Sequence, residues 1–172
     1  MRTYLCAFGL LAALLGAAPA HAQFSNRSLG LSLGYMDFKK TAGLEGTPFF
    51  GLEGSLYIEN GFEVVSLSKL LFPVDTYATP EKRVIGLAPS LGIRYLLFEE
   101  SIRPYIGTDV SYLIVFKDSV SNFVGLGPNV GVDFFVTDTV SLGVRGQYNF
   151  YLALNEDTQT SLTGSVGVAA YF

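Results

Sequence analysis

Apolar and polar residues alternate one by one over several long stretches of the chain. The clearest stretches are residues 29–35, 85–95 and 124–134, where Leu, Ile, Val, Tyr and Phe are interleaved mostly with Gly, Ser and a few charged residues. A period of two puts one set of side chains on each face of a β-strand. A soluble sandwich would give the same alternation in strands of about five or six residues. These longer runs match the roughly 9–11 residues that cross a bilayer at a tilt.

An internal repeat indicates how many strands to expect. Residues 51–58, 86–93 and 125–132 resemble one another, and a weaker copy lies at 162–168. The matching leucines of successive copies are separated by 35, 39 and 36 residues. A unit of that size is one long hairpin with its loops, so four units make eight strands. Shared Gly and Leu composition is the alternative explanation, but the even spacing and the common face parity favour a repeat.

The connections between these runs alternate between short and long. Asn60-Gly61 favours a type I′ hairpin turn, and residues 99–101 and 137–139 are typical of further tight turns. The other connections are polar and mostly longer, which is the pattern of an outer-membrane barrel with its longer loops outside the cell. The sequence therefore predicts an all-β fold, an eight-stranded antiparallel up-and-down transmembrane β-barrel. The expected strands are 28–38, 49–59, 62–71, 84–97, 103–116, 123–136, 140–153 and 161–172.

The N-terminus has the three parts of a secretory signal peptide. Arg2 supplies a positive charge, residues 5–19 are uncharged and rich in Leu and Ala, and Ala20 and Ala22 form an A-x-A-like cleavage site. A membrane-anchoring helix is the alternative, but the apolar stretch is short and ends in Pro and small residues. We therefore expect residues 1–22 to be removed and residues 23–172 to form one barrel domain.

The last eight residues carry the most specific motif. Ser165, Gly167, Ala170 and Phe172 occupy the polar, glycine, apolar and terminal aromatic positions of the C-terminal assembly signal of bacterial outer-membrane barrels. Together with the leader and the strand count, they make the mature chain resemble the small OmpA/OmpX-type barrels. The resemblance implies a place in the bacterial outer membrane, contact with outer-membrane lipids and lipopolysaccharide, and insertion by the barrel-assembly machinery. Periplasmic or lipoprotein partners stay open.

Polar residues fall on the face that should point into the barrel. They are Glu53, Tyr57, Glu59, Arg94, Asp109, Asp133, Arg145, Gln147, Asn149 and Tyr151. Arg94 and Asp109 lie almost symmetrically about a turn, so we expect them to face each other, and Asp133 should lie one diagonal step from Arg145. An eight-stranded barrel is just wide enough for its side chains to fill. We interpret the six charged residues of this set as a structural network that closes the lumen; an ion path or a catalytic carboxylate pair is the alternative.

Composition narrows the function further. Hydrophobic residues make up 49% of the chain and charged residues 15%, and the net charge of −4 argues against nucleic-acid binding. Removing the leader removes Cys6 and His21, the only cysteine and histidine, so a Ser-His or Cys-His catalytic site is not expected. We predict no catalytic, metal or cofactor site, and a role in envelope integrity or surface contact through the outer loops. A subunit of a multiprotein envelope machine for export or surface motility is the alternative, followed by a narrow pore or a lipid-A-active enzyme.

Overall fold

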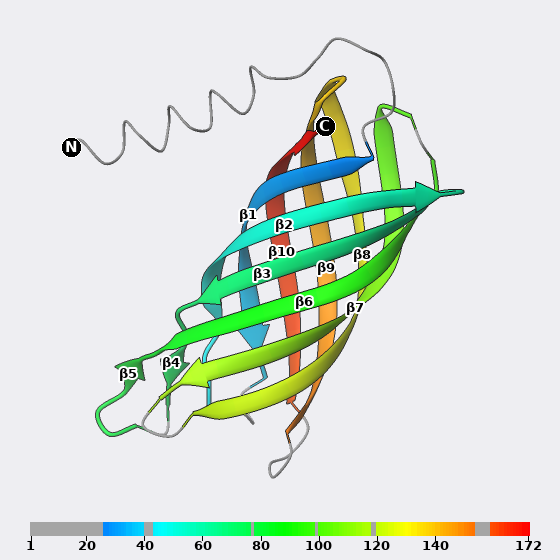
Figure 1. Cartoon of the computed structure of the whole chain (residues 1–172). Coiled ribbons are helices and arrows are strands. Elements are labelled where there is room, and N and C mark those ends of the chain that lie inside the picture. Colours follow the sequence, from blue (N-terminus) through cyan, green and yellow to red (C-terminus); the bar gives the residue numbers. More distant parts are fainter. Residues whose placement is uncertain (1–25, 40–42, 77, 99, 118–119, 154–158) are drawn as a thin grey trace, which may run out of the picture.

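Eight long strands close into an antiparallel barrel in the computed structural model of the chain (Figure 1). The structure describes residues 26–39, 43–76, 78–98, 100–117, 120–153 and 159–172. The long strands are β1 (Arg27–Phe38), β2 (Thr47–Glu59), β3 (Phe62–Leu71), β6 (Ile85–Leu96), β7 (Ile102–Phe116), β8 (Ser121–Thr137), β9 (Val140–Ala153) and β10 (Gln159–Tyr171). Each predicted strand end lies within two residues of the observed one. The predicted fold is confirmed, whereas the predicted cleavage site at Ala20 and Ala22 lies outside the described residues.

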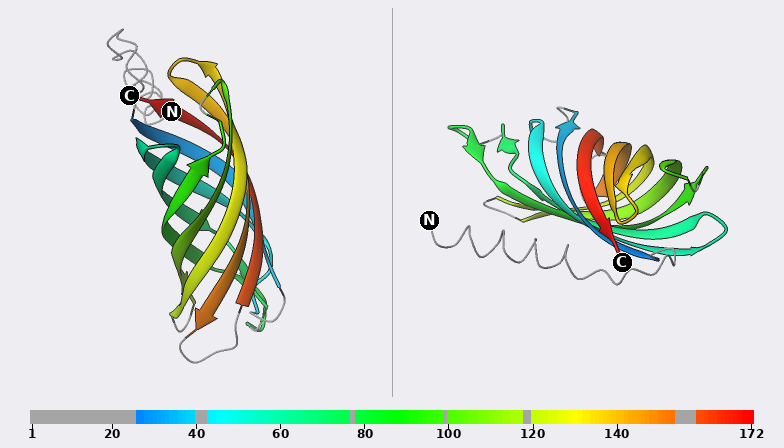
Figure 2. Two further views of the ribbon diagram at one scale, coloured as in Figure 1. Left: turned by 90° about the vertical axis from the view of Figure 1, so that its right-hand side faces the viewer. Right: turned by 90° about the horizontal axis from the view of Figure 1, so that it is seen from above.

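The two ends of the barrel differ in their connections. At one end, tight connections join β2 to β3, β6 to β7 and β8 to β9, and the C-terminus lies there too (Figures 1 and 2). We call this the short-turn end and the opposite one the long-loop end. Asn60 has a φ of 54° and Gly61 a φ of 81°, so both occupy the left-handed region that the predicted type I′ turn requires.

A small hairpin in the connection from β3 to β6 is absent from the sequence prediction. It consists of β4 (Val74–Asp75) and β5 (Lys82–Arg83), at the long-loop end (Figure 1). Hydrogen bonds tie it to the connection between β1 and β2, because Glu45 N donates to Val74 O at 3.0 Å and Thr76 N donates to Gly43 O at 2.8 Å. Strands of two residues are too short for an alternating pattern to show.

The outer wall of the barrel is apolar. Leu31, Leu91 and Val166, on three different strands, are each more than half exposed on it. Two prolines interrupt the backbone ladder in the wall, since the β6–β7 pairing is broken at Pro89 and the β8–β9 pairing at Pro128 while the register on either side is unchanged. This is the loosened pairing expected where a proline removes a donor. Among the described residues, no helix is long and apolar enough to span a membrane.

The lumen contains a buried apolar layer that the sequence prediction, with its polar lumen, missed. We call it the apolar plug: Met36, Phe38, Leu44, Phe49, Leu71, Val84, Ala88, Leu113, Val115, Phe123 and Tyr151. These residues lie in the half of the lumen nearer the long-loop end. Glycines make room for the larger rings, because a Cβ on Gly125 would lie 2.6 Å from the Tyr151 ring and one on Gly34 would lie 2.5 Å from Phe49.

Candidate functional site in the barrel lumen

Arg94 of β6 is the first centre of an ion-pair network in the other half of the lumen. It is buried, with 4% of its surface exposed, and its Nε donates to Glu63 Oε2 at 2.6 Å. Its Nη1 lies 3.4 Å from Glu53 Oε1 and its Nη2 lies 3.3 Å from Asp133 Oδ2. The guanidinium also packs over the Tyr105 ring, 4.6 Å from the centroid. One arginine therefore joins carboxylates from β2, β3 and β8.

Arg145 of β9 is the second centre. Its Nη2 donates to Asp109 Oδ2 at 3.2 Å, and its Nη1 lies 3.6 Å from Glu53 Oε2. Glu53 therefore contacts both arginines, one through each carboxylate oxygen. Because buried charges are costly unless they are paired, this shared carboxylate holds the two centres together.

Neutral amides extend the network toward the long-loop end. Gln147 Nε2 donates to Asp109 Oδ1 at 2.6 Å, and Gln147 Oε1 accepts a hydrogen bond from Lys69 Nζ at 2.8 Å. Asn149 Nδ2 donates to Ser161 Oγ at 3.0 Å. Lys69 is 2% exposed, and its ammonium lies 5.7 Å from the centroid of the Phe49 ring. The polar network thus reaches the edge of the apolar plug.

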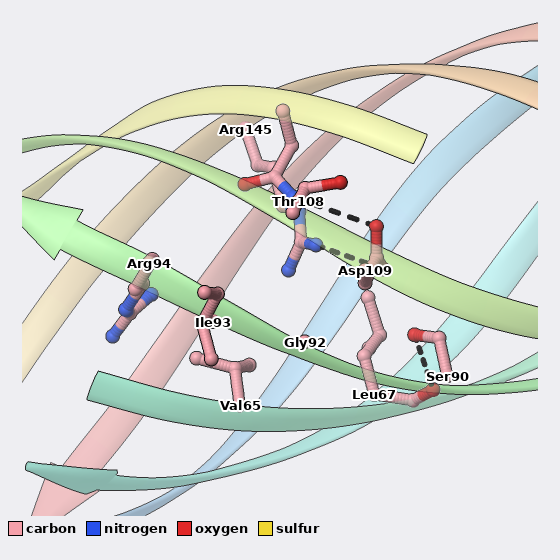
Figure 3. A pocket seen from close by; sticks show the side chains of 10 residues that line it. Val65, Leu67, Ser90, Gly92, Ile93, Arg94, Thr108, Asp109 and Arg145 are labelled. Atoms are coloured by element: carbon pink, nitrogen blue, oxygen red, sulfur yellow. Dashed lines mark hydrogen bonds and ion pairs between the residues drawn. The ribbon is translucent and has the colours of Figure 1, made fainter. Parts of the chain in front are cut away.

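The predicted pairing of Arg94 with Asp109 is wrong. Figure 3 shows the dashed contact of Asp109 running to Arg145, while Arg94 points elsewhere. The strand register gives the reason: Arg94 lies opposite Gly107, and Asp109 lies opposite Gly92. The hairpin is therefore not centred where the sequence symmetry put it, and the side chains pair across the lumen instead of along the wall.

Of the remaining expectations about the charges, the diagonal placement of Asp133 and Arg145 is confirmed, and the placement of Glu59 in the lumen is wrong. Asp133 and Arg145 are diagonal neighbours as predicted, but Asp133 pairs with Arg94, and Arg145 pairs with Asp109 and Glu53. Glu59 does not lie in the lumen network: it is exposed at the end of β2. A β-bulge after Tyr57 shifts the register there, and a bulge of this kind re-aims the side chain that follows it.

Glu63 and Lys69 belong to the network and were not predicted. Both lie on β3, where they alternate with outward-facing residues as Val65 and Leu67 do, and both are buried. The alternation itself could have placed them in the lumen. It was hard to recognise because β3 carries two serines, Ser66 and Ser68, on its exposed face.

The residues of the expected assembly signal run from the middle of β10, at Ser165, to Phe172 directly after its short-turn end. Phe172 is 65% exposed, and its backbone N donates to Arg27 O at 2.9 Å. Ala170 pairs with Leu29 and Ser165 with Gly34 across the β1–β10 seam that closes the barrel. Their role in assembly stays a prediction.

The chemical role that this arrangement of charged residues supports is stabilisation of the lumen. We call the seven charged residues the lumen network: Glu53, Glu63, Lys69, Arg94, Asp109, Asp133 and Arg145. Each of its carboxylates contacts an arginine, so the negative charges are compensated within the lumen. Among the described residues, no group of three or more His, Cys, Asp or Glu side chains is placed to hold a metal ion.

Comparisons with known proteins agree with the barrel fold. Residues 8–172 match the family described as outer membrane protein beta-barrel domain. Among solved structures, Neisserial surface protein A is similar, with 20% identity, a TM-score of 0.69, and coverage of 86% of this chain and 98% of that one. The N-terminal β-barrel domain of Pseudomonas aeruginosa OprF has 14% identity, a TM-score of 0.58, and coverage of 87% and 100%. Ail of Yersinia pestis has 14% identity, a TM-score of 0.53, and coverage of 86% and 99%. No curated protein matches the sequence.

Proposed function

The chain belongs to the family of outer membrane protein β-barrel domains, and we propose that it serves there as a closed, non-catalytic barrel that makes contacts at the cell surface through its long-loop end. Its location is the bacterial outer membrane. The short-turn end then faces the periplasm, as in other barrels of this kind. The long-loop end then faces the outside of the cell, where its exposed residues can support envelope integrity or surface contact.

The proposal rests on the hairpin of β4 and β5 at the long-loop end, which we call the outer hairpin. Strands β4 and β5 pair with each other, and Leu44 of the neighbouring connection forms a bridge with Asp75. Val84 N also donates to Pro73 O at 2.9 Å, which closes the base of the hairpin. A surface that is already ordered loses less conformational entropy when it binds a partner. Two adjoining connections thus support one preorganised contact surface.

Lipopolysaccharide is the partner that this surface fits best. Lys82 and Arg83 are both exposed on β5, and Arg side chains bind phosphate groups through paired hydrogen bonds. Contact with phosphates of the surrounding lipopolysaccharide would fix the barrel in the outer leaflet and contribute to envelope integrity. The barrel-assembly machinery stays an expected partner during insertion, on the strength of the C-terminal motif.

Site-specific photo-cross-linking in cells tests this proposal. One photoreactive residue replaces Glu81, which is exposed beside Lys82 and Arg83 and leaves both basic side chains in place. A second, separate variant carries it at Asp138, which is exposed in the turn between β8 and β9. We expect lipopolysaccharide adducts at position 81 and none at position 138. A stable set of periplasmic proteins captured at position 138, with no adduct at position 81, would favour a subunit of an envelope machine instead. Release of acyl groups from lipopolysaccharide by the purified protein would contradict the non-catalytic assignment.

A further inference from the structure

A cavity of about 40 Å³ lies in the lumen between the lumen network and the short-turn end. Glu53, Tyr105, Asp133, Ser141 and Arg145 are among the residues that line it. A water molecule needs roughly 10–15 Å³ of such volume and two to four polar partners, so the space suits about three waters and is too small for an organic ligand. Its lining of donors and acceptors supplies the partners.

Buried polar atoms without a hydrogen bond also indicate that the cavity suits water. Among the described residues, Asp133 Oδ2 and Arg145 Nε are buried side-chain atoms without a hydrogen bond, and both residues line this cavity. Asp133 is 7% exposed and Arg145 is 9% exposed. Asp133 Oδ2 has a charged neighbour in Arg94 Nη2 at 3.3 Å but no hydrogen bond of proper geometry. Leaving such atoms unsatisfied is costly, whereas water accepts from one and donates to the other.

The two ends of the lumen are closed by different means. Toward the short-turn end, the Arg103 guanidinium lies 4.1 Å from the centroid of the Phe135 ring, which in turn lies 4.8 Å from that of Tyr171. Arg103 and Phe135 are partly exposed, so this stack borders solvent. Toward the long-loop end, the apolar plug has Met36 and Val115 fully buried. Water therefore has several polar partners in the cavity, whereas among the described plug residues Tyr151 Oη is the one buried polar side-chain atom without a hydrogen bond.

We propose that the lumen is a half-channel: a water-filled inner compartment that exchanges with solvent at the short-turn end, sealed by the apolar plug and not by the ion pairs. The lumen network forms the wall of this compartment, and the plug residues are the barrier to ions and water.

Silver ions, which are about as small as water and bind thiols, probe the two halves of the lumen separately. Ser141 lines the cavity and Ser161 lies in the outer half, and both are 1% exposed, so Ser141→Cys and Ser161→Cys are a matched pair. Both are made in a Cys6→Ser background to keep the thiol unique. In folded protein in lipid vesicles, we expect the Ser161→Cys thiol to react with silver more than about tenfold slower than the Ser141→Cys thiol. Silver reaches position 161 only when the side-chain packing of the outer half opens.

Loosening the plug should remove this difference. Phe38 belongs to the plug and pairs directly with Ser161 across the β1–β10 seam. Phe38→Ala should raise the silver reaction rate of Ser161→Cys and leave that of Ser141→Cys unchanged. Equal rates in the two single-cysteine proteins, or a slower rate for Ser141→Cys, would overturn the proposal.

A measurement on the unmutated protein does not depend on the variants folding. In a nuclear magnetic resonance spectrum of the barrel, the Arg145 Nε–H should show magnetisation transfer from water. The Arg94 Nε–H should not, because it donates to Glu63 at 2.6 Å, although Arg94 is buried as Arg145 is. Absence of a water signal at Arg145 would show that the cavity is dry and refute the half-channel.

Discussion

Replacing Arg94 by Met should destabilise the barrel more than any other single change in the lumen network. The Met side chain keeps much of the packing against Tyr105 and removes only the charge and the donors. Three carboxylates lose a partner at once, and the nearest of them, Glu63, is 3% exposed. Breaking a buried ion pair in this way costs about 3–5 kcal/mol, and water in the cavity beside Asp133 places the effect toward the lower end.

A second substitution distinguishes loss of a pair from loss of packing. In the Arg94→Met background, Glu63→Gln removes the carboxylate that was left buried. The double variant should therefore be more stable than the sum of the two single effects predicts, by about 0.5–3 kcal/mol. The same cycle with Asp109→Asn should give a smaller coupling energy, because Asp109 is bound by Arg145 and Gln147 and not by Arg94.

Urea unfolding in lipid vesicles measures these free energies. The chain has no Trp, so circular dichroism or the fluorescence of its 10 Tyr residues follows the transition. Additive effects for Arg94→Met and Glu63→Gln, or a coupling to Asp109 as large as that to Glu63, would refute the pairing described above. A coupling to Asp109 as large as that to Glu63 would support the pairing of Arg94 with Asp109 that the sequence symmetry predicts.

Two further changes test the terminal residue and the packed lumen. Deleting Phe172 should lower the folded fraction in the outer membrane, measured by heat-modifiable gel mobility, whereas Phe172→Tyr should restore it; normal insertion of the truncated chain at low expression would contradict this. Gly125→Ala should destabilise the barrel to urea because its Cβ would lie 2.6 Å from Tyr151, while Gly146→Ala, with no atom within 4 Å, should be neutral. Equal effects of the two alanines would argue against a close-packed lumen.

The strands could be predicted from the sequence because one bilayer-length pattern decides both their length and their faces. A residue such as Leu31 or Leu91 must meet lipid, so its neighbours in the chain must point inward. The Asn60-Gly61 turn was predictable for a local reason, since both residues take positive φ in the structure. Such features depend on contacts within one strand or one turn.

The pairing of the charges could not be derived in the same way. Arg94 reaches carboxylates on β2, β3 and β8, and which of them lie within reach depends on the registers of all the strands between them. A two-residue error in the register of one hairpin was enough to assign the wrong partner to Asp109. The bulge that moves Glu59 out of the lumen and the short β4–β5 hairpin likewise leave no periodic signal in the sequence.

Planar-bilayer recording of the purified wild-type protein tests whether the barrel is closed. The apolar plug closes one half of the lumen with buried side chains, so we predict no steady conductance. The Arg94→Met variant should stay closed as well, because the plug is unchanged in it. Large, ion-selective channels in the wild type that disappear in the Arg94 variant would contradict the account and make the lumen network a selectivity filter.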